Sequence, residues 1–162
     1  MYGWYDEPSG KYDVAQICLN GHVANSSVTT FPEGCREYCN KCGEKTIVAC
    51  PSCSNKIRGS YTLVAGGYNM PSYCEHCGKP FPWVAKRLEA AEELAELIDE
   101  FSVEDRMLLK TNLGDIVRDN PRSQVAALKV KKVLSKASPH FISAFRDILI
   151  NVISDPINKQ IW

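Results

Sequence analysis

The sequence predicts an α+β protein with a small, β-rich N-terminal part and an α-helical C-terminal part. All eight cysteines lie between Cys18 and Cys77, and nine of the ten glycines and eleven of the fifteen aromatic residues precede Val84. After the segment Pro80–Trp83, apolar residues recur with the period of an α-helix. We therefore expect two domains, at residues 1–83 and 84–162.

The helical domain is expected to begin with two helices. Residues Val84 to Asp99 place four apolar residues on one stripe (Leu88, Ala91, Ala95 and Ile98) and four glutamates elsewhere (Glu89, Glu92, Glu93 and Glu96). Ser102 is a favourable N-cap, and acidic residues follow it in the first turn, so the second helix is expected to run to about Arg118.

Proline marks the start of each later helix, because it is well tolerated at the first helical position. Asn120-Pro121 is expected to open a third helix that runs to about Ala137, and Ser138-Pro139 a fourth. Asp155-Pro156 is expected to begin a last turn that ends at Trp162. The pattern predicts about four helices, forming a compact domain or a dimerising bundle.

Cysteine spacing favours metal binding over disulfide bonding in the N-terminal domain. The first ten residues lack the basic start and apolar run of a signal peptide, so we expect a reducing, cytoplasmic setting. Six of the cysteines form CxxC pairs, which suit two ligands of one metal ion better than a structural disulfide. Short strands are expected at Asp13–Ile17, Thr46–Ala49, Ile57–Val64 and around Tyr73.

Four short segments each offer two metal ligands. They are Cys18 with His22, Cys39 with Cys42, Cys50 with Cys53, and Cys74 with Cys77. Zinc takes four nitrogen or sulfur ligands in a tetrahedron, and sets of four cysteines, or of three cysteines and one histidine, are common in structural sites. Gly21, Gly43 and Gly78 stand where tight turns of this kind need a residue without a Cβ.

The chain between Cys42 and Cys50 decides which pairs share a metal ion. Its end reads as a strand, and at ~3.3 Å per residue an extended link of this length separates the two cysteines by about 20 Å. One zinc ion, with bonds of ~2.3 Å to sulfur, cannot reach both. The sequence therefore predicts two zinc ions in two consecutive zinc ribbons, with a hairpin turn near Gly66-Gly67 in the second.

The predicted ligands of the first site are Cys18, His22, Cys39 and Cys42, and those of the second are Cys50, Cys53, Cys74 and Cys77. Cys35 competes with His22 for the first site, because it could supply a fourth sulfur. We favour His22, since Cys18 would otherwise lack a partner in its own turn. His76 lies inside the last CxxC turn and is expected to point to solvent.

These motifs resemble a bacterial double-zinc-ribbon family that is classified as a domain of unknown function. The similarity is carried by the segments Ile17–Val23, Tyr38–Gly43, Cys50–Cys53, Ile57–Gly59 and Cys74–Trp83, and it extends through Arg118–Arg122 and Arg146–Leu149. The resemblance implies zinc binding in a bacterial cytoplasm. It implies no activity.

Catalysis is not expected, because both zinc sites have four protein ligands and leave no position for water. The sequence contains no phosphate-binding loop, no GxSxG and no HExxH, and His140 is expected to be a surface residue. Lys and Arg number 19, as do Asp and Glu, so no overall charge draws the chain to a nucleic acid or a membrane. We therefore expect a non-enzymatic adaptor whose partner is another protein or a second copy.

Nucleic-acid binding is the alternative. Arg122, Lys129, Lys132 and Lys136 fall on one face of the third predicted helix, where they could contact a polyanion. More often such a stripe is a solvated face, or it meets an acidic face such as that of the first helix. The N-terminal domain offers aromatic residues for stacking, but its seven acidic and seven basic side chains give it no basic surface.

Overall fold

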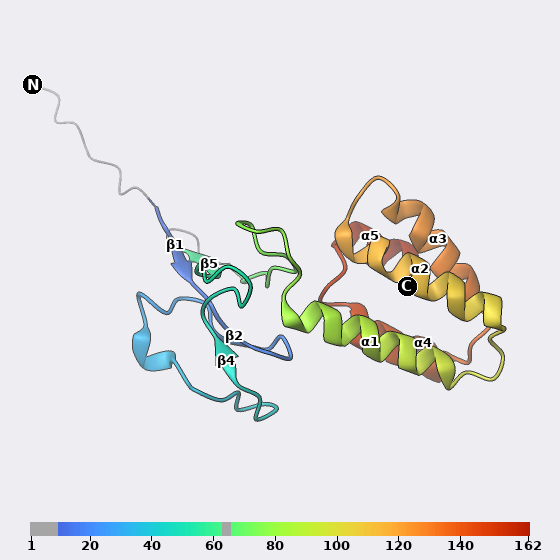
Figure 1. Cartoon of the computed structure of the whole chain (residues 1–162), viewed down its shortest axis with the longest axis horizontal. Coiled ribbons are helices and arrows are strands. Elements are labelled where there is room, and N and C mark those ends of the chain that lie inside the picture. The colour runs from blue at the N-terminus through green and yellow to red at the C-terminus, as the bar shows by residue number, and fades with distance from the viewer. Residues whose placement is uncertain (1–9, 63–65) are drawn as a thin grey trace, which may run out of the picture. The chain divides into compact units, whose positions relative to one another are not determined.

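The computed structural model describes residues 10–62 and 66–162. The chain divides into two compact units, one ending at Pro82 and the other comprising Trp83–Trp162. Short strands occupy the first unit and helices the second, which confirms the predicted α+β class (Figure 1).

Two small sheets form the N-terminal unit. Strands β1 (Tyr12–Val14) and β5 (Arg58–Tyr61) pair antiparallel in one sheet. The other has the order β3-β2-β4, with β2 (Gln16–Cys18) pairing antiparallel with both β3 (Val23–Asn25) and β4 (Thr46–Ile47). The sequence predicted one strand where β1 and β2 lie, and it did not predict β3.

The break between β1 and β2 lets one chain segment serve both sheets. The N–H of Ala15 donates to the carbonyl of Ile57 (2.9 Å) on the β5 side. One residue later, the buried side chain of Gln16 hydrogen-bonds to Arg36 through both the backbone N–H (3.0 Å) and the carbonyl (2.9 Å) of that residue. The segment thus changes partners at Ala15, and Gln16 fixes the loop that leads to Cys39.

The hairpin expected at Gly66-Gly67 would pair β5 with a strand that follows it. In the described part of the chain β5 pairs instead with β1, which is distant in the sequence. Val64, the predicted end of this strand, lies outside the described residues. Gly59 makes the pairing with β1 close, since a Cβ atom there would collide with the carbonyl oxygen of Ser26 and lie 2.7 Å from the carbonyl carbon of Val14. Tyr73 forms only an isolated bridge with Pro80.

Five helices form the C-terminal unit. They are α1 (Pro82–Glu96), α2 (Val103–Arg118), α3 (Ser123–Leu134), α4 (Pro139–Leu149) and α5 (Asp155–Ile161). Ser102 caps α2 as predicted: its hydroxyl accepts from the N–H of Asp105, whose carboxylate accepts from the N–H of Ser102 (both 3.1 Å). The third helix begins two residues later than predicted, because the Asn120 side chain accepts from the N–H of Arg122 and holds a turn there.

The helices bury an apolar core. Its largest fully buried side chains in this unit are Trp83, Phe145, Ile98, Leu109, Leu113, Ile116 and Leu149. Arg87 of α1 donates to the carbonyl of Ile148 (2.6 Å), which ties α1 to α4 (Figure 1). Lys136, just after α3, forms an ion pair with Asp105 of α2 (2.7 Å). No helix in the described part of the chain is long and apolar enough to cross a membrane.

Candidate metal centres

Three CxxC turns in the N-terminal unit have the same backbone structure. In each, the N–H of the residue after the second cysteine donates to the carbonyl of the first at 2.8 Å, as Gly43 does to Cys39. An isolated β-bridge closes each turn, at Tyr38–Lys45, Ala49–Lys56 and Tyr73–Pro80. The residue after the second cysteine has a positive φ in every case, and it is Gly43, Ser54 or Gly78. Ser54 is the one of the three that carries a side chain in this left-handed conformation.

The fourth turn is built differently, because it joins strands β2 and β3. The N–H of Gly21, at φ 85°, donates to the carbonyl of Cys18 (2.8 Å), and the N–H of Cys18 donates to the carbonyl of His22 (2.9 Å). The His22 N–H lies 3.2 Å from the Cys18 sulfur. This turn therefore presents a histidine and a cysteine to the same point.

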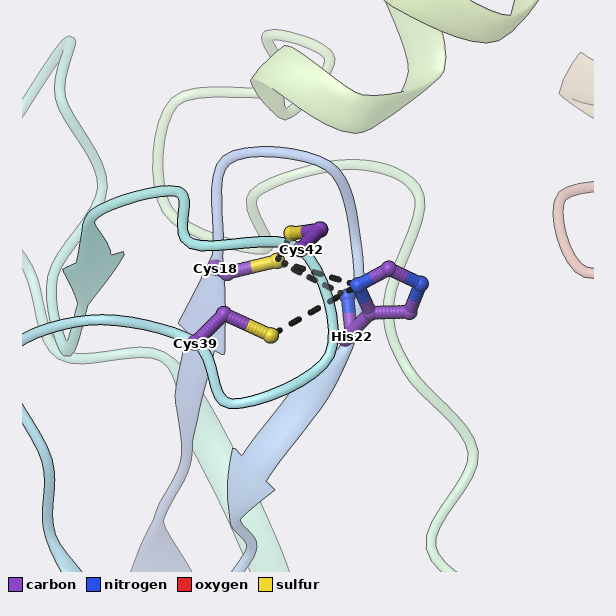
Figure 2. Close-up of side chains that lie close together, drawn as sticks. All are labelled: Cys18, His22, Cys39 and Cys42. Carbon is purple, nitrogen blue, oxygen red and sulfur yellow. Dashed lines mark hydrogen bonds between the residues drawn. The ribbon is translucent and has the colours of Figure 1, made fainter.

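The first centre contains Cys18, His22, Cys39 and Cys42, whose ligand atoms all lie within 4.8 Å of one another. Pairing of β2 with β4 brings the two turns together, because Cys18 ends β2 and β4 follows the Cys39–Cys42 turn. The Nδ1 atom of His22 lies 3.6 Å from the sulfur of Cys18 and 3.6 Å from that of Cys39 (Figure 2). The sulfur of Cys42 lies 3.8 Å from that of Cys18.

The second centre contains Cys50, Cys53, Cys74 and Cys77, again within 4.8 Å of one another. The sulfurs of Cys50 and Cys77 are 3.8 Å apart, and those of Cys53 and Cys74 are 3.7 Å apart. Each close contact joins one turn to the other, as a shared ion requires.

These distances fit zinc. A regular tetrahedron with zinc–sulfur bonds of ~2.3 Å has sulfur–sulfur edges of about 3.8 Å, and a zinc–nitrogen bond of ~2.0–2.1 Å gives sulfur–nitrogen edges of about 3.5 Å. The measured sulfur–sulfur distances are 3.7–3.8 Å and the sulfur–nitrogen distances are 3.6 Å. None of the eight cysteines forms a disulfide, although a disulfide would bring two sulfurs to about 2.05 Å. Each cluster could hold one zinc ion.

Hydrogen bonds and burial act in opposite directions on the thiols of the first centre. Burial raises the pKa of Cys18, in spite of hydrogen bonds from the N–H groups of His22 and Asn20. For Cys39 burial also favours the thiol, but the N–H groups of Lys41 and Cys42 outweigh it and lower the pKa to about 6.

The second centre shows the same contrast. The side-chain amide and backbone N–H of Asn55 lower the pKa of Cys53 to about 6. The N–H of Lys79 favours the Cys77 thiolate, but burial and the three neighbouring cysteines raise the pKa of Cys77 to about 11. Each centre thus combines a readily ionised thiol with one that holds its proton, so that metal binding releases protons and strengthens as the pH rises.

Two asparagine side chains add hydrogen bonds to ligand sulfurs, and the sequence analysis did not identify them. The Nδ2 of Asn20 lies 3.5 Å from the sulfur of Cys42, and that of Asn55 lies 3.3 Å from the sulfur of Cys53. Their positions within two residues of a ligand were the available signal, because a side-chain amide at that distance can reach a ligand sulfur.

The remaining sulfur and imidazole groups lie outside both clusters. Cys35 is exposed, and the side-chain amide of Asn25 lies 3.6 Å from its sulfur. His22 therefore occupies the position for which Cys35 competed. His76 is exposed and lies 3.6 Å from the carboxylate of Glu75, and the exposed ring of His140 packs edge-on against Phe141.

The four basic residues of the predicted polyanion contact have different surroundings. Arg122 precedes α3 and lies 3.6 Å from the carboxylate of Asp115. Lys136 follows α3 and is bound to Asp105. Lys129 and Lys132 are exposed on α3 and contact no carboxylate in the described part of the chain. Carboxylates of α2 therefore neutralise both ends of the stripe.

A comparison with protein families identifies the chain. Residues 11–161 match the model of a family described as an uncharacterised protein conserved in bacteria, DUF2321. The chain belongs to this family. The match covers both units and confirms the resemblance inferred from the cysteine motifs. No curated protein and no solved structure matches the chain.

Proposed function

We propose that this DUF2321 protein is a non-enzymatic, cytoplasmic adaptor that uses its zinc-stabilised N-terminal unit to recognise a protein partner and its helical unit to associate with a protein. The observation that carries the proposal is an aromatic-lined hollow beside the second metal centre. The hollow has a volume of about 520 Å³.

Five aromatic residues line this hollow. They are Tyr12 of β1, Tyr61 of β5, and Tyr68, Tyr73 and Phe81 from the segment around the last CxxC turn. Tyr12 and Tyr61 are packed with ring centroids 5.0 Å apart. Aromatic rings supply large contact areas at a small cost in side-chain entropy, and they are enriched at protein interfaces.

A charged pair gives the hollow its polar edge. The guanidinium of Arg58 lies 4.4 Å from the centre of the Tyr12 ring and forms an ion pair with Glu75 at 2.5 Å. The Tyr68 hydroxyl donates to the Arg58 carbonyl (2.6 Å), and burial raises the pKa of Tyr68 to about 12, so this donor keeps its proton. Pre-arranged rings with a few fixed polar groups suit a peptide segment that carries apolar side chains.

The zinc ions have a supporting role in this proposal. Each of the two clusters supplies four ligands, and a catalytic zinc needs an open position for water. When bound, the second ion fixes the turn that carries Glu75 against the turn that precedes β5. The metal thereby holds the hollow in shape without taking part in a reaction.

The test is a comparison of two tyrosine substitutions of equal exposure. Tyr12 is 57% exposed in the hollow, and Tyr38 is 56% exposed in the same unit outside it. We expect proteins that co-purify quantitatively with the tagged wild type to be retained by Tyr38→Ala and lost with Tyr12→Ala, at unchanged zinc content. Identical partner sets for the two variants would refute the proposal.

Nucleic-acid binding remains the second candidate, and it now depends on Lys129 and Lys132 alone. Two exposed cations provide few phosphate contacts, so affinity would be weak and would depend only modestly on salt. Mobility shifts at low salt with wild type and with Lys129→Ala/Lys132→Ala test it. Retardation that the double substitution abolishes would favour this alternative over the adaptor.

A further inference from the structure

The helical unit carries a groove of about 450 Å³ between α1 and α2. Glu92, Glu93 and Glu96 line its α1 side, and Val103 and Met107 line its α2 side. Both apolar side chains are 64% exposed, although they neighbour each other on one face of α2. The groove is therefore an apolar strip with an acidic wall.

The acidic wall is only partly neutralised. Lys110 lies 3.2 Å from the carboxylate of Glu92, and Arg106 lies 3.5 Å from that of Glu96. The Arg106 guanidinium also donates to the carbonyls of Ala95 and Ile98, which fixes it at the end of α1. Glu93 is exposed and has no cation partner among the described residues. Its carboxylate remains available to a cation from outside the unit.

The outer face of α3 has the opposite character. Val125 and Leu128 are 55% and 56% exposed, and Lys129 and Lys132 lie beside them without a carboxylate partner in the described chain. The face turned towards the core holds Ala126, Ala127, Val130 and Val133. The α3 face thus carries two apolar residues flanked by two cations. It is complementary to the groove, which has two apolar residues beside a row of carboxylates.

We propose that the outer face of α3 binds the groove between α1 and α2 of a second copy of the chain. A single chain presents both surfaces, so two copies related by a two-fold axis can form the contact twice. Leu128 of one copy would meet Met107 of the other, and Lys132 would face the other copy's Glu93. Each contact would involve only a few side chains, so we expect a reversible dimer with a dissociation constant of about 1–100 μM.

This inference rests on the proposed adaptor role of the helical unit, for which it names the partner. The first test is sedimentation velocity on the zinc-loaded, full-length protein over a concentration series. We expect a dimer in the wild type, and a dissociation constant raised about tenfold or more by Lys132→Glu or by Glu93→Lys, because each reversal places like charges together. The matched control is Lys159→Glu, an exposed cation on α5, which should leave the dimer intact.

Mixing the two charge-reversal variants gives the decisive result. In a mixed dimer, the groove of the Glu93→Lys variant meets the α3 face of the Lys132→Glu variant, so opposite charges face each other again. The second contact of that dimer joins a wild-type groove to a wild-type helix. Each variant alone should dimerise weakly, and the mixture should form a 1:1 heterodimer with nearly wild-type affinity. Leu128→Ser and Met107→Ser should each weaken the dimer without affecting folding, since both side chains are exposed.

A wild type that stays monomeric, a mixture that stays monomeric while the wild type dimerises, or full dimerisation of Leu128→Ser would each overturn the inference. These outcomes are separable from failure of the adaptor proposal. A protein partner that depends on Tyr12 would leave that proposal standing even if the chain were a monomer.

Discussion

The two units of this protein are stabilised in different ways. In the described part of the N-terminal unit only eight apolar residues are buried, and four of them are cysteines of the metal centres. The helical unit buries 22, including large side chains such as Trp83 and Phe145. The first fold therefore depends on metal coordination and on precise backbone contacts, and the second on the hydrophobic effect. Loss of metal should therefore destabilise the N-terminal unit and spare the helical unit, and a cavity in the apolar core should do the reverse.

Removal of zinc should have the largest effect. Chelation is expected to unfold the N-terminal unit, because structural zinc contributes about 10 kcal/mol or more to folding of small metal-dependent domains. Helical circular dichroism should persist while amide resonances of the N-terminal unit collapse. Elemental analysis should find two zinc ions per chain, falling by one in Cys74→Ser and remaining at two in Cys35→Ser. Loss of zinc from Cys35→Ser would show that the assignment of the first centre is wrong.

Phe145→Ala should have the next largest effect, and it should act on the other unit. The side chain is fully buried in the helical core, so its truncation is expected to cost about 3–5 kcal/mol. Urea denaturation followed by helical circular dichroism measures this change. Zinc content should not change, and its loss would contradict the independence of the two units.

Gly59→Ala should destabilise the N-terminal unit while its metal ligands remain intact. A methyl group there would meet the backbone of Ser26 and of Val14, neither of which can move without disturbing the pairing of β1 with β5. Overpacking of this kind costs about 1–3 kcal/mol. Thermal unfolding of the zinc-loaded protein should show a lower transition for this unit, whereas Gly67→Ala, where a Cβ atom meets nothing within 4 Å, should not.

Asp105→Asn should weaken the helical unit in a pH-dependent manner. The ion pair with Lys136, the Ser102 N–H and the Ser102 hydroxyl lower the pKa of Asp105 below its ordinary value of 3.8. The carboxylate therefore contributes stability above that value, and the contribution is lost as the pH falls through the pKa of the folded state. Asp105→Asn should lower the melting temperature at pH 7, and the difference from the wild type should shrink below pH 4. A difference that is constant with pH would mean that Asp105 acts without its charge.

Ser54→Gly should have the smallest effect and should be stabilising. Ser54 has a φ of 64° at the position where the two equivalent turns have Gly43 and Gly78. Relief of the left-handed conformation gains about 1–2 kcal/mol, of which the greater flexibility of glycine in the unfolded chain offsets about 0.5–1 kcal/mol. A slightly higher affinity of the second centre for zinc, measured by competition with a chelator, is the expected result. Gly43→Ala should act in the opposite direction on the first centre.

Most of the metal chemistry could be read from the sequence because it depends on local spacing. Two cysteines separated by two residues form a turn that offers two sulfurs to one ion, and the short link between Cys42 and Cys50 keeps consecutive turns on different ions. The starts of α2 after Ser102 and of α4 at Pro139 were also predicted from local signals, because an N-cap residue or a proline acts within one helical turn. The α+β class and the number of zinc ions follow from these signals.

Other features depend on contacts between residues far apart in the chain. The break at Ala15, the pairing of β5 with β1 and the approach of Nδ1, rather than Nε2, of His22 to the sulfurs each depend on a partner that no local pattern specifies. The same holds for the neutralisation of Arg122 and Lys136 by α2, since a helical wheel places charges on a face without showing what lies opposite. The sequence by itself determined the seven cysteine ligands, their grouping on two ions and the helix starts at Ser102 and Ser138-Pro139. The tertiary structure decided that His22 rather than Cys35 joins the first centre, which strands pair and which charges remain exposed, because those depend on long-range packing.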